Sequence, residues 1–125
     1  MSKRLAFLPY AIAIAASAVL ALSDIPKSLG AHPWWATMVV WRGLPIGLII
    51  AFALQFTGMS KMLRAVLISA VIVIAAFVSS YNHANFVAAE DADAYWPGLI
   101  WFYGWITMMA ALPALIVTVL QKRRA

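Results

Sequence analysis

The strongest constraint on the fold is the arrangement of the apolar residues, which form four long runs separated by short polar connections. The runs cover residues 6–22, 33–56, 65–84 and 96–120. Each run can cross a bilayer, because a helix of about 20 apolar residues spans about 30 Å of hydrocarbon. Short connections make consecutive spans antiparallel neighbours. The sequence therefore predicts one all-α integral membrane domain over residues 1–125, an antiparallel bundle of four transmembrane helices.

The composition agrees with a membrane protein and excludes several other classes. Hydrophobic residues make up 66% of the chain and charged residues only 10%, whereas a soluble surface needs far more charge. The sequence contains no cysteine, so it forms no disulfide and no thiolate metal site. A net charge of +5 would suggest nucleic-acid binding in a soluble chain. Here the basic residues flank the apolar runs, so we expect anionic lipid and not nucleic acid as their partner.

The distribution of charge predicts how the bundle is oriented. One side of the predicted bundle holds seven of the nine basic residues: Lys3, Arg4, Lys61, Arg64, Lys122, Arg123 and Arg124. The other side holds the acidic residues Glu90, Asp91 and Asp93, and also Asp24 with Lys27. Basic residues favour the cytoplasmic side of a membrane. We therefore expect both termini to be cytoplasmic in a multi-pass protein of the plasma membrane, that is, the inner membrane of a bacterium.

The first run also has features of a cleavable signal peptide. Basic residues precede it, and it contains the small-residue pattern Val19-Leu20-Ala21, which is typical of a cleavage site. Cleavage would leave three spans. We favour retention of the first run as a span.

Arg42 is a charged residue inside the second run. If that span begins at Pro33, the Arg42 backbone lies about 10 Å below the outer edge of the hydrocarbon, where an unpaired charge costs about 2 to 3 kcal/mol. We therefore expect the guanidinium to find partners. The groups at the same predicted depth are Ser79, Ser80, Asn82 and His83 on the third span, and Trp101, Tyr103 and Trp105 on the fourth.

Two interpretations of Arg42 follow. In the first, the side chain only ties the helices together through these groups, as polar residues commonly do in membranes. In the second, Arg42 and Trp41 belong to an outward-facing polar vestibule, where the guanidinium meets an anionic group of a lipid, pigment or solute. We favour the tie, because no intramembrane carboxylate accompanies Arg42 to suggest a proton relay.

Small residues at four-residue spacing predict close helix packing. The second span has Gly43, Gly47 and Ala51, and the first has Ala13, Ser17 and Ala21. Stripes of this kind let helix backbones approach closely. We expect these two stripes to face each other.

The sequence shows no pattern that predicts catalysis or a bound metal. His32 with Glu90, Asp91 and Asp93 matches no closed zinc or calcium spacing, and His32 and His83 lie at predicted span ends, where a haem pair is not favoured. Nucleophile–base pairs, phosphate loops and paired carboxylates are also missing from the sequence. We expect no cofactor and no enzymatic activity.

Two functional hypotheses remain. The first is an accessory or assembly subunit that packs against a larger membrane complex. The alternative is a small oligomeric transporter, or a binder of lipid or another amphipathic ligand, with an outward-facing vestibule around Arg42, Trp41, Trp105, Asn82 and His83. The direction of the polar face of the third span separates the two. An inward face with Arg42 favours a site, and an outward face favours a missing partner.

Overall fold

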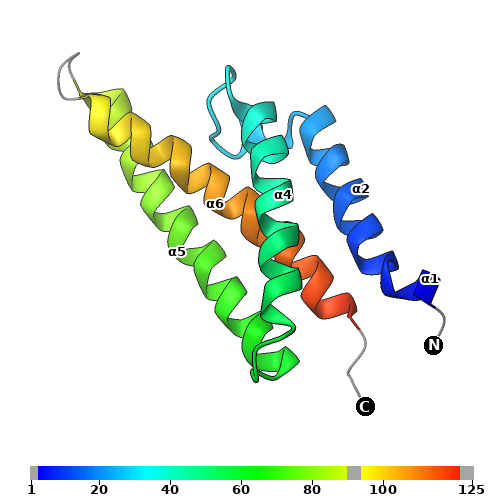
Figure 1. Ribbon diagram of the computed structural model, residues 1–125. Helices are drawn as coiled ribbons and strands as arrows, with labels where there is room; N and C mark the ends of the chain where they lie inside the picture. Colours follow the sequence, from blue (N-terminus) through cyan, green and yellow to red (C-terminus); the bar gives the residue numbers. More distant parts are fainter. Residues whose placement is uncertain (1–2, 90–93, 122–125) are drawn as a thin grey trace.

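The computed structural model describes residues 3–89 and 94–121, and every regular element in this part of the chain is a helix. The helices are α1 (Lys3–Ala6), α2 (Leu8–Leu22), α3 (Ile25–Ser28), α4 (Ala36–Leu54), α5 (Lys61–Ala88) and α6 (Tyr95–Leu120), drawn in Figure 1. Some charges used to predict the orientation lie outside the described residues: Glu90, Asp91, Asp93, Lys122, Arg123 and Arg124.

Helix α6 is the centre of the arrangement. It packs against α5, α4 and α2, whereas α5 packs mainly against α6. Figure 1 shows α6 running diagonally from beside α5 to beside α2. Helix α1, the turn between α4 and α5 and the last turn of α6 lie at the same end of the arrangement, and we call this the α1 end. The opposite end, which contains α3 and the first turns of α4 and α6, is the α3 end.

Three of the helices, α4, α5 and α6, are long and apolar enough to cross a membrane. They have 19, 28 and 26 residues. Helix α2 is also apolar but has only 15 residues, a length of about 22 Å. The chain is therefore a helical membrane protein with several candidate spans.

The ends of the helices differ from the predicted spans for local reasons. The first run is divided between α1, which ends at Ala6, and α2, which begins at Leu8. Pro9 lies in the first turn of α2, where proline fits best. The second span begins later than expected: the Trp35 amide donates to the His32 carbonyl over 3.2 Å in a turn that precedes α4. The third begins earlier, because the Ser60 hydroxyl accepts from the Leu63 amide and caps α5.

The glycines of α4 pack against α6 and not against α2 as the sequence suggested. A Cβ on Gly43 would lie 2.5 Å from the Met109 carbonyl carbon, and one on Gly47 would collide with the Ala110 carbonyl oxygen. These glycines therefore face α6, while α2 packs against another part of α4, where the Thr37 hydroxyl donates to the Ala21 carbonyl over 3.3 Å. Ala51 and Ala13 nevertheless share one core cluster, whose buried members are Ala13, Ala51, Ile68, Ala111, Ala114 and Val117.

Candidate functional site

Trp101 is the centre of a buried cluster at the α3 end. Its side chain is only 4% exposed, and its indole N–H donates to the Gly30 carbonyl over 3.1 Å. The Ser79 hydroxyl of α5 donates to the Trp101 carbonyl, also over 3.1 Å. Gly30 has a φ of +110°, a conformation that residues with a Cβ rarely adopt. Trp101 thus joins α5, α6 and the segment between α3 and α4.

Aromatic rings surround this tryptophan. The His83 ring stacks on it with centroids 4.1 Å apart and an interplanar angle of 9°. Trp35 meets it edge-on at 4.9 Å, and His32 does so at 5.7 Å. Such pairs each contribute about 0.5 to 1.5 kcal/mol beyond the burial of their area. We call Trp101, His83, His32, Trp35 and Phe86 the aromatic cluster, since the Phe86 ring also lies 5.3 Å from Trp101.

The aromatic cluster brings two imidazoles to one tryptophan but forms no evident metal site. Within residues 3–89 and 94–121, no group of three or more His, Asp or Glu side chains lies close enough to hold an ion. Both His32 and His83 are only partly buried. The cluster is suited to fixing the packing of the α3 end.

Arg42 forms none of the interactions that were expected with the residues at its predicted depth. Its side chain is exposed on α4, and no hydrogen bond or ion pair joins it to Ser79, Asn82 or His83 in the described part of the chain. The Asn82 side chain instead donates to the Val78 carbonyl over 2.7 Å. The contacts that would tie the helices through Arg42 are therefore not formed here.

The remaining predicted residues also separate. Ser79 and Trp105 are buried, at 1% and 5% exposure, and Trp105 belongs to a core cluster with Val39 and Ala36. Trp41 and Tyr103 are exposed, at 45% and 55%. Ser79 and His83 both contact Trp101, Ser79 at the backbone carbonyl and His83 at the indole ring.

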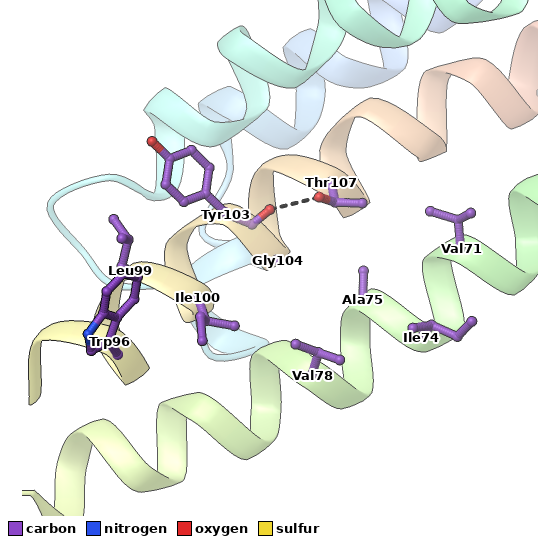
Figure 2. Close-up of a pocket in the computed structure, with 10 residues that line it drawn as sticks. All are labelled: Val71, Ile74, Ala75, Val78, Trp96, Leu99, Ile100, Tyr103, Gly104 and Thr107. Atoms are coloured by element: carbon purple, nitrogen blue, oxygen red, sulfur yellow. Dashed lines mark hydrogen bonds between the residues drawn. The ribbon is translucent and has the colours of Figure 1, made fainter.

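An apolar groove lies between α5 and α6, with a volume of about 480 Å³. Figure 2 shows Ala75 and Val78 of α5 and Ile100 of α6 pointing into the space between the two helices. Thr107 donates its hydroxyl proton to the Tyr103 carbonyl over 2.9 Å, so its polar group is satisfied within α6. The groove is lined by Val71, Ile74, Ala75, Val78, Trp96, Leu99, Ile100, Tyr103, Gly104 and Thr107.

A polar network at the α1 end was not predicted from the sequence. Gln121, at the end of α6, accepts from Lys61 Nζ at its backbone oxygen over 2.8 Å and from Arg64 Nη1 at its side-chain oxygen over 3.3 Å. Its amide donates to the Tyr10 hydroxyl and to Gln55 Oε1, over 3.3 and 3.4 Å. The network joins the ends of four helices. Its only signal in the sequence is a glutamine near the end of two apolar runs, Gln55 in the second run and Gln121 directly after the fourth.

Comparisons with family models, with curated proteins and with solved structures found no match to this chain. Its function therefore rests on its own geometry. Two features require a chemical explanation: the exposed guanidinium on α4 and the cationic network at the α1 end.

Proposed function

We propose that this protein is an accessory or assembly subunit of a larger membrane complex, and that Arg42 binds a carboxylate of the partner. In this proposal all four apolar runs cross the membrane, both termini are cytoplasmic, and the α3 end faces outward. The observation that carries it is an exposed guanidinium on a membrane-spanning helix, with no hydrogen-bond or ion-pair partner among the described residues.

The depth and direction of Arg42 support an external partner. Arg42 lies six residues into α4, about 9 Å along the helix, and leaving it unpaired there would cost about 2 to 3 kcal/mol. The buried face of α4 is formed by other residues, among them Val39, Gly43 and Gly47. An acceptor supplied by another chain would recover this cost, and a helix carrying Asp or Glu has that chemistry.

The environment of α5 also favours a subunit over an isolated bundle. Helix α5 is the longest helix, and among its membrane-spanning residues only Ile68, Ala75 and Ser79 are buried. The groove that it forms with α6 is almost free of polar groups (Figure 2). A second helix with small side chains fits against such a surface, because membrane helices associate through close van der Waals packing.

The alternative, a transporter or ligand binder with a vestibule around Arg42, has less support. Arg42 lines neither the groove between α5 and α6 nor the cavity at the α1 end. Trp105 is buried in the core, and Asn82 bonds to its own helix. These residues do not converge on a space that a ligand could occupy together with Arg42.

The test compares Arg42→Gln with the matched control Lys27→Gln in membranes of the native host. Lys27 is an exposed cation at the α3 end, 3.9 Å from Asp24. We expect the tagged wild type and Lys27→Gln to migrate on a native gel in mild detergent as an assembly much larger than the 13.7 kDa chain. Arg42→Gln should release the chain from that assembly. An unchanged assembly for Arg42→Gln would contradict the proposal.

A stability measurement separates this proposal from the helix tie. Because Arg42 makes no hydrogen bond or ion pair with the described residues, Arg42→Gln should change the free energy of unfolding of the purified chain by less than about 0.5 kcal/mol and leave its Tm nearly unchanged. A tie between helices would instead lower the Tm of the isolated chain.

Charge reversal at Arg42, rescued by Asp→Lys or Glu→Lys in the partner, would identify the carboxylate.

A further inference from the structure

The cationic network at the α1 end lies on the wall of a cavity of about 1230 Å³. This cavity lies between α1, the start of α2, the end of α4, the turn between α4 and α5, the start of α5 and the end of α6. Most of its wall is apolar. The apolar residues that line it are Leu5, Ala6, Phe7, Leu8, Pro9, Ile12, Phe52, Phe56, Met59, Met62 and Leu120.

Two cations, Lys61 and Arg64, lie on the wall of this cavity. Both donate to Gln121, and both of these acceptors are neutral: the backbone oxygen for Lys61 and the amide oxygen for Arg64. The Nε of Arg64 is buried and has no acceptor among the described residues. A cation withdrawn from water is stabilised by an opposite charge and by acceptors for each donor. Arg64 has one neutral acceptor for its guanidinium.

Within residues 3–89 and 94–121, no carboxylate side chain belongs to the cavity. None of the residues that line it is acidic. The sequence contains four acidic residues, and Asp24, Glu90, Asp91 and Asp93 belong to the segments that join α2 to α3 and α5 to α6. Lys61 and Arg64 therefore have no carboxylate counter-charge among the described residues of this cavity.

We propose that the cavity binds one anionic membrane phospholipid, with its phosphate at Lys61 and Arg64 and its acyl chains along the apolar wall. A phosphate oxygen accepts strong charge-assisted hydrogen bonds from guanidinium and ammonium groups. Both cations lie in the first turn of α5, where the positive end of the helix dipole adds to the attraction. The apolar wall explains why the ligand is a lipid and not a free anion, because burial of acyl methylenes adds affinity that inorganic phosphate does not have.

This inference goes beyond the proposed function and does not depend on it. The phospholipid site lies at the α1 end, whereas Arg42 lies toward the α3 end. Arg42→Gln should therefore lose the complex but still bind lipid. Lipid binding by a variant of Arg64 is measured on the purified chain, without any partner subunit.

The experiment offers the purified full chain an equimolar mixture of phosphatidylglycerol and phosphatidylcholine in mild detergent and counts retained lipids by native mass spectrometry. We expect the wild type to retain one phosphatidylglycerol with a preference of about tenfold. Arg64→Gln should abolish the preference, Arg64→Lys should keep most of it, and the control Lys27→Gln should keep all of it. Equal retention of the two lipids by the wild type, or equal losses in Arg64→Gln and Lys27→Gln, would overturn the proposal.

Three further arms protect the test from misfolding and from a simple anion site. If Arg64→Gln does not fold, as judged by its Tm, Lys61→Gln removes a charge from the same cavity and should weaken the preference. Leu8→Trp fills part of the apolar wall and should reduce phospholipid retention while both cations remain. Inorganic phosphate should compete only weakly; competition as strong as that of phosphatidylglycerol would show a soluble-anion site and refute the lipid.

Discussion

At the residue scale, identical side-chain types have opposite roles according to the face of the helix that carries them. Trp101 is buried and donates its indole N–H to Gly30, whereas Trp41 is 45% exposed on α4. The sequence places both in outer span halves and does not distinguish them. The difference follows from which neighbours α6 and α4 meet, and so it required the structure.

Substitution of these two tryptophans by phenylalanine tests the distinction. Trp101→Phe removes the hydrogen bond to Gly30 and part of the stacking surface for His83, so we expect a loss of about 1 to 2 kcal/mol in the free energy of unfolding. Trp41→Phe is the matched control and should change it by less than about 0.5 kcal/mol. Unfolding with sodium dodecyl sulfate in mixed micelles measures both. Equal losses would mean that Trp101 does not join the α3 end.

At the scale of the elements, the contact between α4 and α6 depends on the absence of side chains. Gly43 and Gly47 lie against the backbone of α6 at Met109 and Ala110, and backbone cannot move aside as a flexible side chain can. Gly47→Val should therefore destabilise the protein by about 3 kcal/mol or more, or prevent folding.

The control for this substitution is Gly58→Ala, because nothing lies within 4 Å of a Cβ at Gly58. Its Tm should equal that of the wild type. Thermal unfolding in detergent, followed by circular dichroism, measures both variants. A Gly47→Val variant with the wild-type Tm would show that α4 and α6 do not approach as closely as this structure has them.

The sequence predicted the positions of helices that depend on hydrophobicity alone, but not the choice of neighbouring helix for each packing surface. The runs at residues 65–84 and 96–120 are helical throughout, as α5 and α6. The partner of Gly43 and Gly47 was wrong, because a stripe of small residues indicates that a helix packs closely but not against which helix. The network around Gln121 was missed for a related reason. It forms only because the ends of four helices lie together in space, and the sequence does not show which helix ends meet.

At the scale of the whole molecule, the described charges at the two ends of the bundle differ. Lys61 and Arg64 lie at the α1 end, and Asp24 pairs with Lys27 at the α3 end, over 3.9 Å. Figure 1 shows the turn between α4 and α5, the last turn of α6 and α1 at the same end of the bundle. A bundle with this polarity inserts with its basic end in the cytoplasm. The orientation remains a prediction.

Single cysteines test the orientation directly, because the chain contains none of its own. Gly58→Cys places a thiol in the open turn before α5, and Leu29→Cys places one beside α3, where Leu29 is 71% exposed. A membrane-impermeant maleimide added to intact cells should label Leu29→Cys at once and Gly58→Cys only after the membrane is opened, since we predict that the basic α1 end faces the cytoplasm. The unmodified chain gives the background signal. Labelling of Gly58→Cys in intact cells would reverse the orientation, and labelling of both sites from outside would mean that α4 does not span the membrane.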